Sequence, residues 1–161
     1  MGMYLQLHAL DPAAAERLAA EPEGMEELLD EDPESSDLVS LEKAWHGLHF
    51  LLTGSAEGGD PPLNFLLKGG TPVGEDLGYG EPRLLAPAEV RQMDAALAGL
   101  SADQLWARFD PARMKQEGIY PGIWDEPEAE LREEYVGYFQ ELKRLVHAAA
   151  GRGQALLVAL T

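Results

Sequence analysis

A length of 161 residues suits one domain spanning residues 1–161, because about 150 residues can sustain a single hydrophobic core. The net charge of -17, from 29 acidic and 12 basic residues, opposes binding to nucleic acid or to an anionic membrane. Cysteine is absent, and neither a signal peptide nor an apolar run of roughly 18 residues is present, so we expect a cytoplasmic protein without disulfides.

The first ten residues alternate between two faces, with Leu5 and Leu7 on the apolar one, and this period predicts a strand. Asp11 and Pro12 form an N-cap followed by a proline at the first helical position. This pair predicts a helix over residues 13–20, and a second short helix is expected over residues 23–29.

Between Glu21 and Asp37 the chain carries nine acidic residues and no Lys or Arg. The simplest interpretation is a solvated surface that keeps the protein soluble. The alternative is a docking face for a basic protein partner, because clustered carboxylates attract a cationic surface.

Residues 41–53 are predicted to form an amphipathic helix. Its apolar stripe consists of Leu41, Trp45, Leu48 and Leu52. Ser40 is a candidate cap for the helix, and Gly54 is expected to end it in the left-handed conformation. His49 interrupts the stripe at its centre, which predicts a buried imidazole within the helix.

Turn-forming residues dominate residues 54–62, and a short apolar helix is predicted over residues 63–68. Glycines and prolines continue through residues 71–83, which indicates extended or hairpin structure. Such glycine density allows close backbone approach to a ligand or to a neighbouring strand. Neither a P-loop nor a dinucleotide-binding spacing of glycines occurs after a predicted strand.

In the C-terminal half, Pro87 begins a predicted helix and a capping box at Ser101 begins another. Asp110 repeats the arrangement of a cap followed by proline. The longest helix is predicted over residues 127–150, and a buried strand over residues 154–160. Terminal strands around a helical middle indicate an α+β fold, a single domain in which a small sheet contains the N- and C-terminal strands and is covered by several helices.

Short blocks along nearly the whole chain are similar to one known family. They are Met1-Gly-Met3, Trp45 with Leu48-His49-Phe50 and Leu52-Thr53-Gly54, Tyr79-Gly80 with Arg83-Leu84-Leu85, Phe109-Asp110, and Ile119-Tyr120-Pro121. Together they resemble the YfbM-like family of uncharacterised bacterial proteins, a domain of unknown function. The resemblance implies a fold and landmarks but no catalytic residues and no cofactor. Ala86 departs from the pattern, because similar sequences place a Ser or Thr there that could cap the helix begun by Pro87.

Glu42, His46 and His49 would share one face of the helix predicted over residues 41–53, and one oxygen with two nitrogen ligands could then hold a metal ion. A pair of histidines at this spacing is a weak signal, and the flanking residues are of core type. A structural role for His49, with its ring hydrogen-bonded to backbone or to a carboxylate, is the stronger expectation. No metal site is therefore predicted.

A second group of candidate residues combines aromatic rings, carried by glycine- and proline-rich segments, with one arginine and one histidine. Its members, the predicted ligand-binding residues, are His49, Tyr79, Arg83, Tyr120 and Trp124. An Arg beside aromatic rings is a plausible anchor for the carboxylate or phosphate of a small anionic ligand. The competing interpretation is a buried Arg83 paired with Asp110 or Asp125 to fasten loops to the sheet.

No catalytic motif occurs: the serines lie at predicted caps or turns, and no spacing singles out two carboxylates. The function hypothesis is therefore an acidic interaction or ligand-binding protein without catalysis, for instance an inhibitor or immunity-type partner of a basic protein bound through Glu21–Asp37. The alternative is an enzyme or sensor that acts on a small anionic metabolite in a pocket lined by His49, Arg83 and Tyr120.

Overall fold

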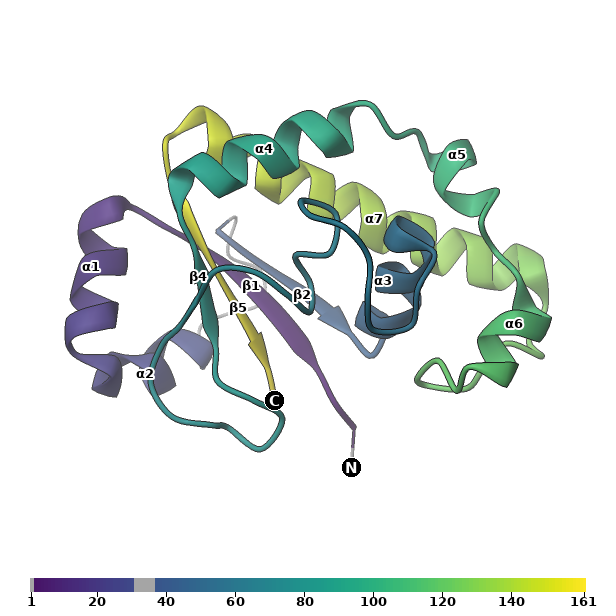
Figure 1. Ribbon diagram of the computed structural model, residues 1–161, viewed down its shortest axis with the longest axis horizontal. Coiled ribbons are helices and arrows are strands. Elements are labelled where there is room, and N and C mark those ends of the chain that lie inside the picture. The colour runs from purple at the N-terminus through teal and green to yellow at the C-terminus, as the bar shows by residue number, and fades with distance from the viewer. Residues whose placement is uncertain (1, 31–36) are drawn as a thin grey trace.

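An antiparallel sheet of five strands forms the middle layer of the protein (Figure 1). The computed structural model describes residues 2–30 and 37–161. The strands are β1 (Leu5–Leu10), β2 (Leu38–Glu42), β3 (Thr71–Pro72), β4 (Arg83–Leu85) and β5 (Ala155–Leu160), in the spatial order β2-β1-β5-β4-β3. Strands β1 and β5 pair along their whole length. The α+β fold with both terminal strands in one sheet is confirmed.

One face of the sheet carries most of the helices and the main core (Figure 1). These helices are α3 (Trp45–Thr53), α4 (Pro87–Ala98), α5 (Ala102–Trp106), α6 (Pro111–Gln116) and α7 (Glu128–Gly151). Gly47 lets α3 approach α7, because a Cβ at this position would lie 2.6 Å from Tyr135 and 2.7 Å from Trp124. In the described part of the chain, no helix has the length and apolar character needed to cross a membrane.

The opposite face carries only a thin layer of short helices, α1 (Pro12–Ala20), a 3-10 turn η1 (Pro22–Gly24) and α2 (Met25–Leu29) (Figure 1). A small cluster of buried side chains joins this layer to the sheet: Leu18, Met25, Val73 and Leu157. Helices were expected to cover one face, but the alternation along β5 buries side chains on both faces. The thin layer leaves hollows beside it, as described below.

The helix predicted over residues 41–53 was wrong at its start. Residues 38–42 form β2, which pairs with β1 through Leu7 opposite Val39 and Gln6 opposite Ser40. Ser40 therefore does not cap a helix, and its hydroxyl accepts a hydrogen bond from the backbone N–H of Glu42 at 3.3 Å. Sheet pairing prevailed because residues 5–8 of β1 offer hydrogen-bonding partners on the side away from β5, with one shift in register between Leu5 and Gln6. The predicted end was confirmed, since Gly54 follows α3 with a φ of 77°.

Other boundaries follow the local rules to different degrees. The capping box at Ser101 is confirmed, since its hydroxyl accepts a hydrogen bond from the N–H of Gln104 at 3.1 Å. The helix predicted over residues 63–68 was wrong, because this segment forms turns in which Asn64 O accepts hydrogen bonds from the N–H groups of residues 67 and 68. The extended or hairpin structure expected over residues 71–83 is present as the β3–β4 pair.

Candidate functional site

His46 is held between two loops by both ring nitrogens. The backbone N–H of Tyr120 donates to Nδ1 at 2.9 Å, so the ring proton lies on Nε2, which donates to the carbonyl of Ala56 at 2.9 Å. Burial lowers the pKa of His46, while the bond to Ala56 and the charge of Glu57 act in the opposite direction. The imidazole of His46 is therefore neutral, and its two hydrogen bonds join the loop after α3 to the turn that contains Tyr120.

His49 lies one turn further along α3 and is fully buried, as predicted. Its Nε2 donates to the carbonyl of Gly58 at 2.9 Å, and its Nδ1 is buried without a hydrogen-bond partner. Burial is the main cause that lowers the pKa of His49; the bond to Gly58 acts in the opposite direction, and repulsion from a protonated His46 and from Lys68 lowers the pKa further. The expected structural role, a ring hydrogen-bonded to backbone, is confirmed.

The helix face expected to carry Glu42, His46 and His49 does not exist. Glu42 ends β2 with a φ of 49°, and α3 begins only at Trp45. The two imidazoles use their Nε2 atoms on backbone carbonyls. Among the described residues, no group of three or more His, Asp or Glu side chains is placed to hold a metal ion.

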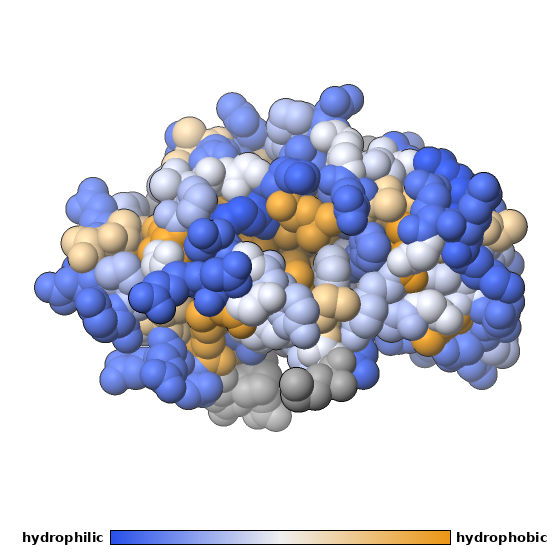
Figure 2. All heavy atoms as spheres, turned by 60° about the horizontal axis from the view of Figure 1, so that its bottom comes forward, coloured by the Kyte–Doolittle hydropathy of each residue, from blue (hydrophilic) through white to orange (hydrophobic). Residues whose placement is uncertain are grey.

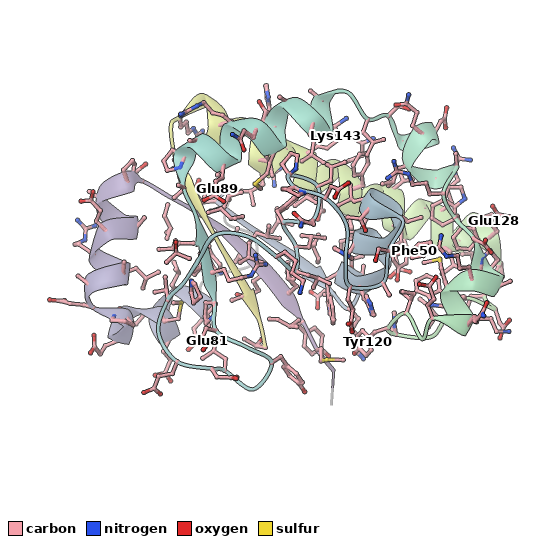
Figure 3. All side chains as sticks on the ribbon, viewed as in Figure 1. Phe50, Glu81, Glu89, Tyr120, Glu128 and Lys143 are labelled. Atoms are coloured by element: carbon pink, nitrogen blue, oxygen red, sulfur yellow. The ribbon has the colours of Figure 1, made fainter. Side chains whose placement is uncertain are left out.

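Tyr120 and Trp124 lie on the turn after α6 and contact the core. Figure 3 labels Tyr120, which lies near the N-terminal end of the chain. The Tyr120 hydroxyl accepts a hydrogen bond from the N–H of Met3 at 3.1 Å, and its ring stacks on Trp45 with a centroid distance of 5.7 Å. Trp124 is buried, and its Nε1 donates to the carbonyl of Ile119 at 2.8 Å. Both residues thus fasten the turn to the molecule.

Arg83 fastens a loop to β4 through backbone carbonyls. Its Nη1 donates to Gly69 O at 2.8 Å, and its Nη2 donates to Phe65 O at 2.9 Å and to Leu66 O at 2.8 Å. Burial lowers the pKa of Arg83 to about 10, and Glu89 opposes this shift. The competing interpretation of Arg83 as a residue that fastens loops to the sheet is therefore confirmed, but its predicted partners were wrong. Asp110 caps α6, and Asp125 pairs with Lys115.

The five predicted ligand-binding residues therefore occupy different settings. Tyr120 meets Trp45 and His46, whereas Arg83 and His49 hold separate parts of the connection between α3 and β3. Tyr79 lies on an exposed loop with 48% of its surface accessible. Across residues 2–30 and 37–161, no hydrogen bond or ring contact joins His49, Tyr79 and Arg83 to one another.

A hollow of about 430 Å³ lies between α2 and the loop of residues 73–82, and we call it the acidic groove. Its apolar lining comes from Pro22, Met25, Val73, Leu77 and Pro82, and its polar lining from Glu23, Glu26 and Glu75. Among the described residues, no Lys, Arg or His lines it. Figure 2 shows this side of the molecule, where orange hydrophobic patches are framed by blue hydrophilic residues.

The loop of residues 73–82 is folded around Asp76. One oxygen of its carboxylate accepts the N–H of Gly78 at 2.6 Å and the N–H of Gly80 at 3.0 Å, and these bonds lower the pKa of Asp76. The N–H of Val73 donates to Pro82 O at 2.8 Å and closes the base of the loop. The folded loop presents Leu77 and Tyr79 to solvent, with exposed fractions of 39% and 48%.

The acidic residues around the groove form no ion pair in the described part of the chain, and Arg17 lines a neighbouring hollow together with Glu21, Glu23 and Glu27. Glu21, Glu23, Glu26, Glu27 and Asp30 are exposed. The remainder of the acidic segment, residues 31–36, lies outside the described residues.

Sequence reasoning found the acidic segment but missed Glu75 and the apolar floor beneath it. The only local signal was the Asp76-Leu-Gly-Tyr-Gly80 run, whose spacing is typical of an Asx-centred turn. The turn and α2 are about fifty residues apart in the sequence. They lie side by side in the structure because β3 and β4, which hold the turn, belong to the sheet that α2 covers.

Comparison with known proteins gives a family and a fold. A family model described as a domain of unknown function, DUF1877, matches residues 1–159. A crystal structure of a protein of unknown function, YfbM from Escherichia coli, is similar over 98% of this chain and 99% of that chain, with a TM-score of 0.71 and 20% sequence identity. At this identity the likeness concerns the fold alone. No curated protein matches the chain.

Proposed function

The chain belongs to the DUF1877 family, and we propose that it is a cytoplasmic, non-catalytic interaction protein that binds a basic protein partner through the acidic groove. The single observation that carries this proposal is the lining of the groove, which combines an apolar floor with three carboxylates and no cation. An inhibitor or immunity-type role would use the same surface.

The lining suits the side chains of Lys and Arg. These residues have an aliphatic stem that packs on apolar surface and a cationic head that seeks carboxylates. Met25, Val73 and Leu77 would contact the stem, while Glu23, Glu26 and Glu75 would receive the head. The net charge of -17 would also raise the rate of encounter with a cationic partner.

The folded loop supports the proposal energetically. Because Asp76 already holds the loop in one conformation, less entropy is lost when Leu77 and Tyr79 meet a partner. Exposed Tyr and Leu side chains beside a groove can serve as anchors of an interface, with Tyr the residue type more often found to dominate binding energy.

The alternative, a small anionic ligand at His49, Arg83 and Tyr120, has weaker support. The Arg83 guanidinium already donates to three carbonyls, and His49 is buried with its Nε2 bound to Gly58. An anion could use at most the two remaining N–H groups of Arg83, and no hydrogen bond or ring contact in the described part of the chain brings His49 or Tyr120 beside them.

The proposal is tested by mapping where a cationic probe binds. An oligolysine peptide is titrated into isotope-labelled protein, and amide shifts are followed by NMR. We expect the largest shifts at residues 22–26 and 73–82. The triple variant Glu23→Gln, Glu26→Gln and Glu75→Gln should weaken binding about tenfold, or ~1.4 kcal/mol, and reduce its salt dependence.

A matched control removes the same number of charges elsewhere. Glu130, Glu133 and Glu141 are exposed on α7, and their replacement by Gln should leave groove binding close to that of the unaltered protein. Shifts spread equally over α7 and the groove, or equal weakening in both triple variants, would contradict the proposal and indicate attraction by net charge alone.

A further inference from the structure

A second hollow of about 490 Å³ continues the acidic groove along α1, and we call it the apolar groove. The two share Val73 and Gly74, so they form one trough around the end of β3. The apolar groove is walled by Pro12, Ala15, Ala19, Pro72, Leu84 and Pro87, and Glu16 is the one charged residue in its lining. The trough therefore changes from nearly uncharged to acidic along its length.

The walls of the apolar groove are low and open. Ala15 and Ala19 present only methyl groups from α1, so the chain of a partner could lie close to the helix. The opposite wall includes β3, the edge strand of the sheet, which spans only Thr71 and Pro72. Pro72 has no N–H to offer a new strand, so an occupant would be held by its side chains rather than by sheet extension.

We propose that the partner presents a linear segment, in which an apolar half lies in the apolar groove and an adjoining basic half lies in the acidic groove. This inference rests on the proposed function and narrows it to a class of ligand. Charge complementarity fixes the basic half, because Glu23, Glu26 and Glu75 occur only at that end of the trough. The lining of the other end, which is apolar apart from Glu16 and Thr71 among the described residues, fixes the apolar half.

The dimensions suit a short segment. Helix α1 has nine residues and is about 13 Å long, a length that roughly four residues of extended chain would span. The acidic groove would then accept the next few residues. A folded basic surface would meet mainly the rims of this trough, whereas a linear segment can insert side chains into both hollows.

The test is an unbiased selection of peptides. A display library of random linear peptides is selected on the unaltered protein, after counter-selection on the bare support, and the enriched peptides are then titrated against the variant Ala19→Trp, whose indole would fill the apolar groove. The enriched peptides should carry apolar residues next to two or more Lys or Arg. Their affinity should fall about tenfold in Ala19→Trp, because the apolar contacts would be lost.

Ala20→Trp is the matched control, because Ala20 is exposed on the same helix but lines neither hollow. Selected peptides should bind this variant as they bind the unaltered protein. Equal binding to both tryptophan variants, with loss of binding in the triple Glu→Gln variant, would overturn the linear two-part ligand and leave the proposed function standing. The proposal would also be overturned if no peptide were enriched. The proposed function is tested separately, by the sites at which oligolysine shifts the amide signals.

Discussion

At the scale of single residues, hydrogen-bond direction fixes the charge state of the two histidines on α3. A carbonyl oxygen can only accept, so the carbonyls of Ala56 and Gly58 require a proton on Nε2 of His46 and of His49. The N–H of Tyr120 occupies Nδ1 of His46. A second proton on His46 would thus oppose that N–H, and one on His49 would be buried without an acceptor.

We therefore predict that stability falls as the pH decreases from 7 towards 5. The pKa values of His46 and His49 lie below their ordinary value of 6.5, so the unfolded chain binds more protons than the folded one in this window. The two neutral rings contribute fully to the free energy of unfolding above pH 6.5. This contribution is lost as the pH falls through their lowered pKa values in the folded protein. Urea midpoints measured across this range report the effect.

Replacement variants separate these rings from the many carboxylates. His46→Gln and His49→Gln should be less stable than the unaltered protein at pH 7, and the difference should shrink towards pH 5. His147→Gln, which removes an exposed imidazole 3.1 Å from Asp94 on the surface, should not show a stability difference that shrinks towards pH 5. Parallel profiles in all three variants would contradict the assignment of neutral rings.

At the scale of elements, arginines stabilise the ends of helices and loops by binding backbone carbonyls. Arg108 donates to the carbonyls of Leu51 and Leu52, and Arg113 donates to that of Gly54 at 2.8 Å. These are among the carbonyls left free at the C-terminus of α3, where a cation is also favoured by the helix dipole. Arg83 does the same for the turns at residues 65–69.

Arg83→Ala should destabilise the protein by about 1–3 kcal/mol, because three carbonyls would lose a charged donor. Arg83→Lys should recover only part of this loss, since one ammonium group has fewer fixed donors than a guanidinium. Hydrogen exchange should quicken at residues 65–70. Urea unfolding measures the change in stability of both variants, and hydrogen exchange followed by NMR measures the change in local opening.

Arg91 on α4 provides the comparison, because it is exposed and makes no hydrogen bond or ion pair in the described part of the chain. Arg91→Ala should change the free energy of unfolding by less than about 0.5 kcal/mol. If Arg83→Ala were equally mild, the fastening role would be wrong, and Arg83 would again be open to a ligand.

At the scale of the whole molecule, the sheet separates a thick helical layer from a thin one. The thick layer contains the main core, including α7, whereas the thin layer of α1, η1 and α2 buries few side chains and carries exposed acids. Both hollows of the trough border this thin layer. The side with the smaller core thus provides the proposed binding surface.

The net charge of -17 should make stability depend on salt. Raising ionic strength from about 0.01 M to about 0.15 M shortens the screening length from about 30 Å to about 8 Å, which should raise the melting temperature. Glu26→Gln with Glu27→Gln should leave stability intact or raise it by a few tenths of a kcal/mol at low salt, since both acids are unpaired and exposed. Calorimetry at the two salt concentrations measures both effects.

Glu117 offers the opposite case, because it pairs with Arg113 at 2.6 Å. Glu117→Gln removes one negative charge together with an attraction, so it should not stabilise the protein. A fall in stability on neutralising Glu26 and Glu27 would show that these acids make favourable contacts, contrary to the prediction.

Local patterns predicted those features that depend on near neighbours in the chain. The cap at Ser101, the left-handed Gly54 and the burial of His49 follow from spacing and residue type. The strand at residues 38–42 could not be predicted in this way, because Leu41 fits a helical stripe and a strand equally well. Its pairing with β1 decided the matter.

The sequence by itself determined the α+β class, the terminal strands, the caps at Ser101 and Asp110 and the excess of acid, since these reside in composition and short-range periodicity. Only the tertiary structure decided where the chemistry-bearing side chains point. Arg83 could have bound an anion or a carbonyl, and the approach of residues 65–69 to β4 selected the carbonyls. Likewise, Glu75 joins Glu23 and Glu26 only because the sheet brings a distant loop beside α2, and such non-local contacts have no signature in a local sequence window.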